Sequence, residues 1–282
     1  MRIRKIAAML LFLVLMAVSS CASAEKTDMA HYLLVGVDGW GLNTEGSARS
    51  DAIILASLDY ERERILFTSF ARDSIVKPSY RKGTVKLNTL VRSSEGEQVL
   101  ADYFEEAFEV KIEGYFVINF SGAVDVINAL GGVELNLSED EVYYINYHAG
   151  DYYGYPLSPG LCRVNGAQAL YYMRCRNLDN DFGRQGRQGN VLRALMKKVS
   201  SITPLRAMGL LDDVLPMVTT DMGNGEILGY ATKVFPMLSG ATMSSQRIPA
   251  DGAYYGAMID GMSVLVADMD KTRELLRSTI GD

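Results

Sequence analysis

The sequence predicts one large α/β domain. Its 282 residues, 48% hydrophobic and 22% charged, supply enough apolar side chains for one large core or two small ones, and we favour one. Short apolar runs that end in charged residues or glycine, such as 31–41 and 65–76, are typical of buried strands. Stretches with helical spacing, such as 98–108 and 269–280, lie among these runs. After the N-terminus no internal repeat or low-complexity tract interrupts the pattern.

The overall charge is acidic. Twenty-eight Lys and Arg against 34 Asp and Glu give a formal net charge of -6 and a pI of about 5.1. A nucleic-acid-binding protein needs a broad basic surface to displace counterions, so we expect no nucleic-acid partner. His31 and His148 are the only histidines, which argues against a Ser-His-Asp hydrolase and against a His-rich zinc site.

Residues 1–24 are predicted to be a targeting segment, because a basic start is followed by the apolar run 6–18. This run is shorter than the roughly 20 residues that a membrane span needs. Three outcomes are open: acylation of Cys21 in the lipobox-like sequence VSSC, cleavage after Ala24, or an uncleaved anchor over 6–24. We favour the first, which makes the protein a lipoprotein on the extracytoplasmic face of the bacterial cytoplasmic membrane.

Three apolar runs, 31–41, 48–59 and 65–76, are predicted strands that carry charged residues at their ends. These residues are Asp38 after the first, Arg49 and Asp51 at the start of the second, and Arg72 and Asp73 in the third. If the middle strand is antiparallel, they meet at one edge of a sheet, where open α/β sheets hold ligands. Singly, each carboxylate is more simply a helix cap, a turn former or an ion-pair partner. Asp38 and Asp51 together offer two hard oxygen ligands, which suit Mg²⁺ beside a phosphate.

Residues 170–193 carry regularly spaced arginines. The first part alternates as a strand does, so we predict a strand with Arg174 and Arg176 on one face. A helix is predicted to open at Asp181 and to present one stripe of donor side chains: Arg184, Arg187 and Gln188. Guanidinium groups gathered at a helix N-terminus suit phosphate oxygens. The alternative is a network of surface salt bridges.

The remaining segments alternate between helix and strand. After Lys86 and Asn88 comes a helix over 98–108, and 115–137 indicates strand, helix and strand. The tyrosine-rich segment 143–155 is expected as a loop or flap over the site, or as ordinary surface. The C-terminal part is expected to hold two helical segments over 204–238, a late strand over 240–252 and a closing helix over 269–280.

Cys162 and Cys175 remain if Cys21 is acylated. They form either a disulfide that closes the loop before the arginine-bearing strand or two free thiols, with Cys175 buried. We expect neither to hold a metal ion.

In this order the motifs resemble the LytR-CpsA-Psr family of cell-envelope proteins, from about Tyr32 to Leu195 and weakly beyond. The motifs that carry the resemblance are LLVGVD, RSDAIIL, SFARDS, KLN, FVINFSGAVDVINALGGVELNL, VNGAQAL with YYMRCR, and DFGRQGRQ. One departure stands out. The family commonly follows its first Asp with Ser-Arg, whereas Gly39 and Trp40 follow Asp38 here, so one phosphate-facing arginine is missing.

The resemblance implies one three-layer α/β/α domain over 30–282, with core motifs in 32–200, a central mixed sheet and an apolar tunnel for a polyprenyl chain. It also implies transfer of a glycopolymer phosphate from a polyprenyl pyrophosphate carrier to a peptidoglycan hydroxyl. Phosphoryl transfer needs charge stabilisation and alignment more than a protein nucleophile. We therefore expect Asp38 and Asp51 to hold Mg²⁺ or Mn²⁺. The pyrophosphate is expected among Arg49, Arg72, Lys86, Arg174, Arg176, Arg184, Arg187 and Gln188.

Three residues are expected to act at the reacting phosphate: Arg72, Asp73 and Asp181. The general base is Asp73, Asp181 or neither, since a metal-bound acceptor can lose its proton to solvent. Two other functions keep the same residues. One is a non-catalytic polyprenyl-pyrophosphate-binding protein, which the departure at Gly39 and Trp40 favours slightly, and the other is a lipid pyrophosphatase with water as acceptor.

Overall fold

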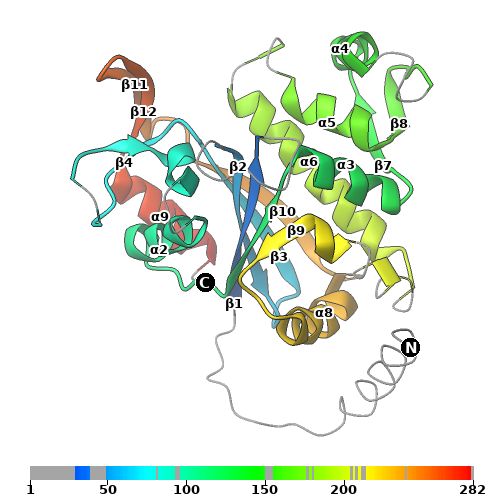
Figure 1. Ribbon diagram of the computed structural model, residues 1–282, viewed down its shortest axis with the longest axis horizontal. Helices are drawn as coiled ribbons and strands as arrows, with labels where there is room; N and C mark the ends of the chain where they lie inside the picture. The colour runs from blue at the N-terminus through cyan, green and yellow to red at the C-terminus, as the bar shows by residue number, and fades with distance from the viewer. Residues whose placement is uncertain are drawn as a thin grey trace, which may run out of the picture.

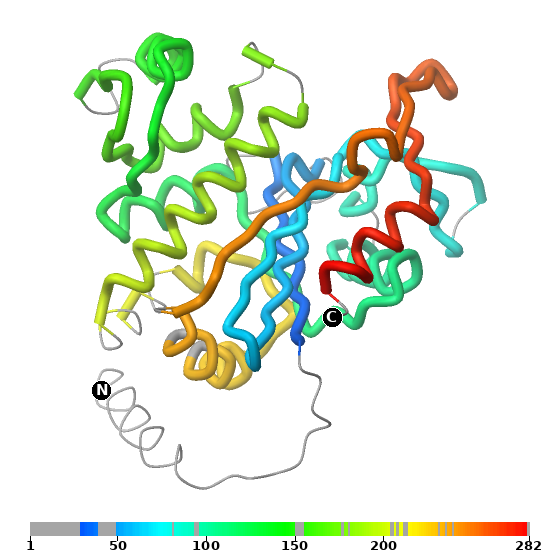
Figure 2. The backbone as a smooth tube through the Cα atoms, turned by 180° about the vertical axis from the view of Figure 1, so that it is seen from behind, coloured from blue at the N-terminus to red at the C-terminus, as the bar shows by residue number. Residues whose placement is uncertain are grey.

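The computed structural model describes residues 29–38, 49–80, 82–92, 96–149, 155–175, 178–179, 181–203, 206, 209–210, 214–238 and 240–280. Within these ranges a six-stranded mixed sheet lies at the centre, with the strand order β10-β3-β2-β1-β6-β9 (Figures 1 and 2). The expected targeting segment 1–24 with Cys21 lies outside the described residues. So do Gly39, Trp40 and Arg176.

The first three predicted strands form an antiparallel meander, as expected. They are β1 (Met29–Val37), β2 (Ser50–Asp59) and β3 (Arg64–Phe70). The meander is extended by β10 (Thr242–Ile248), parallel to β3, by β6 (Gly114–Ile118), parallel to β1, and by β9 (Val218–Thr220), antiparallel to β6. The antiparallel course of β2 brings the end of β1, the start of β2 and the end of β3 to one edge of the sheet.

Helices cover both faces of the sheet, which confirms the three-layer α/β/α prediction (Figure 1). On β1, Leu33 and Val35 pack toward α2 (Gln98–Phe108) and α9 (Met269–Ile280). Tyr32, one residue out of phase, packs toward the opposite layer. That layer contains α6 (Asp181–Ser200) and α8 (Asn224–Leu238). The alternation follows from the two-residue period of a strand, and burial on both faces explains why the predicted strands are continuous apolar runs.

A second group of elements stands beside this sheet and has its own apolar cluster around Ile127, Ile145 and Val164. It consists of α3 (Phe120–Ala129), β7 (Val133–Leu137), α4 (Glu139–Ala149), β8 (Gly160–Val164) and α5 (Gly166–Arg174). The strand, helix and strand predicted over 115–137 are β6, α3 and β7, so that prediction is confirmed.

Short elements complete the described chain. They are β4 (Ile75–Val76), β5 (Val85–Lys86), the 3-10 helices η1 (Leu87–Arg92) and η3 (Leu215–Met217), and the hairpin of β11 (Tyr254–Ile259) and β12 (Met262–Ala267). The hairpin projects from the molecule (Figure 1) and is joined to the chain that follows β3 by a hydrogen bond from Leu265 N to Asp73 O at 3.0 Å. None of the described helices is both long and apolar enough to cross a membrane.

The strand predicted for residues 170–176 is wrong, because residues up to Arg174 belong to helix α5. The helix begins with a capping box in which Asn165 accepts from the Gln168 backbone while the Gln168 side chain accepts from the Asn165 backbone. This cap fixes the first turn, and the turns that follow bury Leu170 and Tyr172. The alternating pattern of residues 170–176 is too short to outweigh the helix start that the capping box fixes.

Three further expectations are corrected or resolved. Residues 143–149 of the tyrosine-rich segment, expected as a loop or flap or as ordinary surface, belong to the helix α4, which buries Val142 and Ile145, so the loop expectation is wrong for them. Part of the region predicted to be helical, 204–238, forms the edge strand β9, which is too short to show a period. Cys162 and Cys175 are free thiols, with Cys175 buried, so the disulfide alternative is wrong.

Candidate active site

A β-bulge sets the position of Asp51 at the edge of the sheet. Gly36 pairs with Ala52 and Val37 pairs with Ser50, so the register passes over Asp51. A bulge leaves its extra residue unpaired and re-aims its side chain. Asp38 follows directly on β1, where its Oδ1 accepts a hydrogen bond from Arg49 N at 2.5 Å. The two carboxylates expected to hold a metal ion therefore come from neighbouring strands at this bulge.

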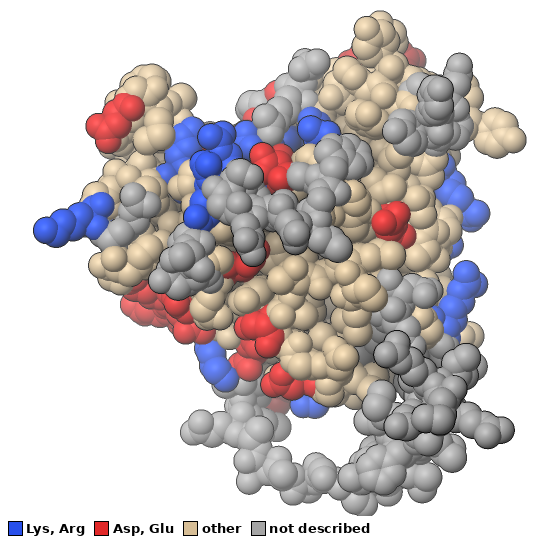
Figure 3. All heavy atoms as spheres, viewed as in Figure 1, with Lys and Arg blue, Asp and Glu red and all other residues tan. Residues whose placement is uncertain are grey.

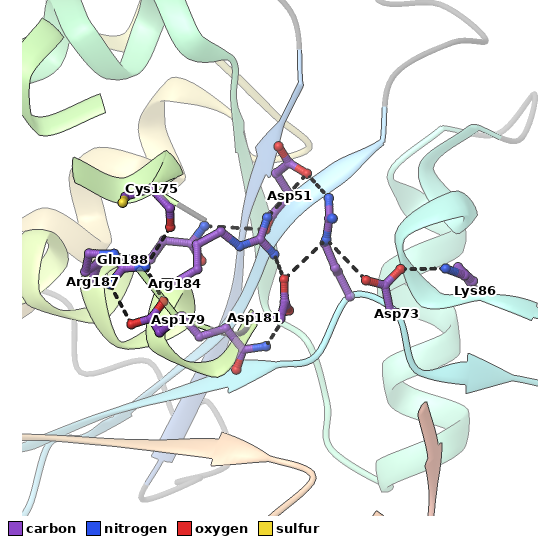
Figure 4. Close-up of polar contacts among 11 residues, drawn as sticks. Asp51, Asp73, Lys86, Cys175, Asp179, Asp181, Arg184, Arg187 and Gln188 are labelled. Atoms are coloured by element: carbon purple, nitrogen blue, oxygen red, sulfur yellow. Dashed lines mark hydrogen bonds and ion pairs between the residues drawn. The ribbon is translucent and has the colours of Figure 1, made fainter. Parts of the chain in front are cut away.

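Arg72 is the centre of the charged network at this edge, and its partners Asp51, Asp73 and Asp181 are labelled in Figure 4. Its Nη1 pairs with Asp51 Oδ1, and its Nε lies 3.6 Å from Asp73 Oδ2 and 3.7 Å from Asp181 Oδ1. This Nε is buried and has no hydrogen-bond partner among the described residues. A buried donor beside two carboxylates can donate to an anionic oxygen that enters the network.

Lys86 extends the network through Asp73. Its Nζ donates to Asp73 Oδ1 at 2.8 Å. The start of η1 is fixed beside it, because Asn88 N donates to Arg72 O at 3.0 Å. The Lys86 ammonium is partly exposed, with a side-chain exposure of 21%, so it can turn toward a ligand without leaving a buried charge behind.

Helix α6 enters the site with its N-terminal turn, which confirms that a helix opens at Asp181. Arg184 Nη2 lies 2.5 Å from Asp181 Oδ1, and Arg184 Nη1 lies 3.8 Å from Asp51 Oδ1. The Arg184 side chain is only 2% exposed. Gln188, one turn later, donates from Nε2 to Asp51 O at 3.5 Å. The helix thus holds a buried cation against the sheet edge.

Arg187 has different partners from Arg184. It donates to both oxygens of Asp179, at 2.8 and 2.7 Å, and to Cys175 O at 2.6 Å. The hydrogen bond with Asp179 raises the pKa of Arg187 above its ordinary value. These contacts tie the start of α6 to the chain after α5. Its predicted role as a phosphate ligand is untested, and its present partners favour a role in the fold.

The other predicted arginines lie at the margin. Arg174 ends α5 and stacks over the ring of Phe120, with its guanidinium carbon 4.3 Å from the ring centroid. Arg49 has an exposed side chain. Figure 3 shows Lys and Arg side chains gathered at this end of the molecule around a smaller acidic group. Asp179 and the stacking partner Phe120 were missed by sequence reasoning, since nothing local marks either as a partner of a distant arginine.

An apolar cavity of about 290 Å³ opens at the network. Asp51, Arg174 and Arg184 are among its lining residues at this mouth. Deeper, it runs between the sheet and helices α3, α5 and α6, past residues such as Ile54, Phe116, Val126, Leu170, Leu192 and Leu195. A site with an apolar interior and cations at its mouth suits an amphiphile that has a hydrocarbon tail and an anionic head.

Three cations, Arg72, Lys86 and Arg184, alternate with three carboxylates, Asp51, Asp73 and Asp181. Their formal charges cancel. Each cation can exchange a carboxylate for a phosphate oxygen at a similar distance, and the freed carboxylates then need a new counter-charge. The freed carboxylates offer hard oxygen ligands, which suit Mg²⁺ or Mn²⁺ as that counter-charge.

The sequence model described as "LytR_cpsA_psr family" matches residues 15–280. Biofilm regulatory protein A of Streptococcus mutans is 30% identical over 180 residues, which are 60% of this chain and 44% of that protein. The polyisoprenyl-teichoic acid–peptidoglycan teichoic acid transferase TagU of Oceanobacillus iheyensis is 30% identical over 199 residues. That match covers 68% of this chain and 58% of the relative. The chain therefore spans about half the length of these two relatives.

Solved structures share the fold. The protein gbs0355 from Streptococcus agalactiae has a TM-score of 0.76 at 24% identity, covering 94% of this chain and 92% of that one. A LytR-CPS2A-psr family protein, YwtF (TagT), with bound octaprenyl pyrophosphate lipid, has a TM-score of 0.68 at 20% identity. That comparison covers 93% of this chain and 95% of the other.

Proposed function

The chain belongs to the LytR-CpsA-Psr family, and we propose that it is a phosphotransferase of the bacterial cell envelope. It moves a glycopolymer phosphate from a polyprenyl pyrophosphate carrier to a hydroxyl of peptidoglycan. One observation carries this proposal: the apolar cavity opens directly onto the buried guanidinium group of Arg184 and its neighbours. The relative named for transfer of polyisoprenyl-linked teichoic acid to peptidoglycan supports the substrate class.

In this proposal the cavity binds the isoprenoid chain near the phosphates. Residues on α3, α5 and α6 surround the hydrocarbon, and its burial supplies binding free energy without direction. Arg72 and Arg184 then orient the pyrophosphate, because guanidinium groups donate in a fixed fork that matches phosphate oxygens. Arg174 at the mouth and Lys86 beyond Asp73 complete the positive side.

The reaction is a displacement at the phosphorus that carries the glycopolymer. The acceptor hydroxyl oxygen forms a bond to this phosphorus while the bond to the bridging oxygen of the pyrophosphate breaks. Polyprenyl monophosphate leaves with the electron pair and remains beside the arginines, which neutralise its new charge. We propose that Asp73 or Asp181, which lie 3.6 and 3.7 Å from Arg72 Nε, accepts the hydroxyl proton, the alternative being that neither does and the proton passes to solvent.

We further propose that Asp38 and Asp51 hold Mg²⁺ or Mn²⁺ together with phosphate oxygens. The residues fit this role, because both carboxylates lie at the bulge. Asp51 pairs with Arg72, and a phosphate that binds Arg72 would free this carboxylate for a metal ion. Among the described residues no three His, Cys, Asp or Glu side chains form a metal site of their own. A bound divalent ion would withdraw charge from the phosphate and offset the negative charge that the substrate brings.

Product analysis tests the activity. Purified protein is incubated with a polyprenyl-pyrophosphate-linked glycopolymer, with and without purified peptidoglycan, and both the polymer and the lipid are identified. The proposal expects polymer bonded to peptidoglycan and release of polyprenyl monophosphate only when both substrates are present. Hydrolysis without peptidoglycan identifies a pyrophosphatase, and binding without any product identifies a carrier protein. Either result overturns the transferase proposal.

The N-terminal sequence suggests where the enzyme is located in the cell. We propose that the lipobox-like VSSC yields a lipoprotein acylated at Cys21, on the extracytoplasmic face of the cytoplasmic membrane. Intact-mass analysis of membrane-extracted protein should then show a lipid on a chain that begins at Cys21, and Cys21→Ser should abolish that mass. Retention of residues 1–20 in the wild-type protein would contradict this processing.

A further inference from the structure

Helix α4 carries an exposed cluster of aromatic rings that the proposed reaction does not use. This α4 aromatic surface consists of Tyr143, Tyr144, Tyr147 and His148, together with Tyr171 of α5. The rings of Tyr143 and Tyr147 lie 6.3 Å apart with planes only 17° from parallel. His148 contacts Tyr144 at 4.2 Å, Tyr147 at 5.0 Å and Tyr171 at 6.0 Å, measured between ring centroids.

The fold does not require Tyr143 and Tyr147. The helix anchors itself through the buried side chains Val142, Ile145 and Ala149, which belong to the apolar cluster it shares with α5. Tyr143 and Tyr147 lie on the other side and are 74% and 73% exposed. Adjacent exposed aromatic side chains mark an interaction surface more often than they mark packing, because tyrosine offers a broad apolar face with a hydroxyl at its tip.

The surface lies at the same end of the molecule as the mouth of the cavity. Glu141, in the first turn of α4, is 3.9 Å from Arg187, one helical turn from Arg184 on α6. Helix α5, which contributes Tyr171, ends with Arg174 at the mouth. Strand β1 begins at the opposite end of the sheet (Figure 1). An attachment through the N-terminus therefore leaves α4 on the side away from the membrane.

We propose that the α4 aromatic surface binds the glycan strand of the peptidoglycan acceptor. This inference rests on the proposed function, for which it supplies the acceptor site. The C–H bonds on the flat face of a sugar ring meet the electron-rich face of an aromatic ring, and two nearly parallel rings can engage neighbouring sugars of one strand. The contact holds the acceptor beside the cations that bind the pyrophosphate.

The charge of α4 selects among possible occupants. Its first turn carries Glu139, Asp140 and Glu141, of which Glu139 and Asp140 are exposed. This acidic turn repels a polyanionic glycopolymer and an anionic lipid surface, but it tolerates N-acetylated amino sugars, whose rings are uncharged. The surface therefore fits the glycan of the acceptor better than it fits the donor polymer or the membrane.

A sedimentation assay with peptidoglycan sacculi, stripped of phosphate-linked polymers and without any lipid substrate, tests this surface. Tyr143→Ala combined with Tyr147→Ala is expected to weaken sacculus binding about tenfold or more, because two stacking faces are lost. Tyr143→Phe with Tyr147→Phe keeps the rings and is expected to stay within about threefold of wild type. Tyr255→Ala changes a tyrosine that is 64% exposed on the β11–β12 hairpin; it is the control and is expected to bind normally.

Binding of octaprenyl pyrophosphate, measured on the same variants, is expected to remain at the wild-type level and shows that each variant is folded. A double-alanine protein that sediments with sacculi as well as wild type overturns the proposal. Failure of the wild-type protein to sediment with sacculi also overturns it. So does a double-alanine variant that keeps sacculus binding but loses binding to anionic vesicles. The assay involves no transfer step, so sacculus binding can be interpreted even if the proposed reaction does not occur.

Discussion

Arg174 and Arg187 differ in their surroundings. Both lie in the same stretch of sequence, and both were expected to bind phosphate. Arg174 is exposed at the mouth of the cavity, where its guanidinium lies over the ring of Phe120. Arg187 is enclosed, with 6% of its side chain exposed, and its donors reach Asp179 and Cys175 O. At the scale of residues, burial and existing partners separate binding from structural roles.

Truncation of Arg174 is expected to weaken lipid binding without unfolding the protein. In Arg174→Ala, one charge-assisted hydrogen bond to the pyrophosphate is lost, which corresponds to roughly a ten- to hundredfold lower affinity for octaprenyl pyrophosphate. Calorimetric titration measures the affinity and thermal unfolding measures the fold. Arg277→Ala, which removes an exposed arginine of α9 that pairs with Glu109, is the control. Equal affinities in both variants would exclude Arg174 from the phosphate site.

Replacement of Arg187 is expected to have the opposite signature. Arg187→Met leaves the Asp179 carboxylate and Cys175 O without their donors, so the free energy of unfolding should fall by about 2 to 4 kcal/mol. Urea denaturation measures this loss, and lipid affinity at low temperature should change less than threefold, by about 0.6 kcal/mol or less. Arg193→Met on the same helix, where Arg193 bonds to Asn190 and Ser245, is the comparison. Unchanged stability with a large loss of affinity would restore the phosphate role.

At the scale of elements, one buried carboxylate ties the turn between β2 and β3. Asp59 is 1% exposed and accepts from Arg62 N at 2.9 Å and from Arg64 Nη2 at 2.7 Å. Burial alone would raise the pKa of Asp59, but the hydrogen bonds from Arg62 and Arg64 outweigh it and lower the pKa.

The stability contributed by Asp59 should therefore depend on pH. Because its folded pKa lies below its unfolded pKa of about 3.9, the contribution is present above about pH 4 and is lost as pH falls through the folded pKa. Asp59→Asn should lower the free energy of unfolding at pH 7 by about 2 kcal/mol, and this deficit should shrink at lower pH. Urea denaturation from pH 7 to pH 3 measures it. A deficit that is constant with pH would contradict the assignment.

Helix α3 forms one wall of the cavity, and Ala123 is the small residue it contributes there. Ala123→Phe should fill part of the space and lower the affinity for octaprenyl pyrophosphate at least about tenfold, while inorganic pyrophosphate binds as before. Separate titrations with the two ligands distinguish binding of the isoprenoid tail from binding of the pyrophosphate head. Asp125→Phe places the same ring on the exposed side of α3 and should change neither affinity. Equal lipid binding by both variants would place the isoprenoid elsewhere.

At the scale of the whole molecule, the site joins elements from distant parts of the chain into one electrically balanced network. Addition of a pyrophosphate upsets this balance, so the affinities for the lipid and for a divalent ion should depend on each other. Mg²⁺ titrated into the protein alone should give little heat, and Mg²⁺ titrated in the presence of a short prenyl pyrophosphate should give a clear isotherm. Asp51→Asn should remove this difference and Asp140→Asn should keep it. Equal Mg²⁺ binding with and without the lipid would argue against Asp38 and Asp51 as the metal pair.

The arrangement also gives the molecule a direction. Strand β1 begins at one end of the sheet (Figure 1), while its last residues, Gly36 and Val37, line the cavity at the other. With the proposed N-terminal lipid anchor, the donor site and the proposed acceptor surface would lie at the end of the sheet away from the anchor. The N-terminal attachment and the position of the site are then two parts of one geometry.

The sequence by itself determined the strands of the meander and the charged residues at their ends, because buried strands and their polar ends depend on local patterns. It also determined the helix that begins at Asp181, whose i, i+3 pair with Arg184 is a local contact. In residues 170–176 local patterns conflicted, and the capping box of Asn165 and Gln168 prevailed over a short alternation.

Only the tertiary structure decided which partner each charge takes. Gln188 meets Asp51 across 137 positions of the chain, and a contact of that kind depends on the packing of α6 on the sheet, which no local pattern encodes. The bulge that passes over Asp51, the pairing of Arg187 with Asp179 and the cavity between the sheet and three helices have the same origin. Each arises where separate elements pack together, and there the physical environment of a side chain is set by residues far from it in sequence.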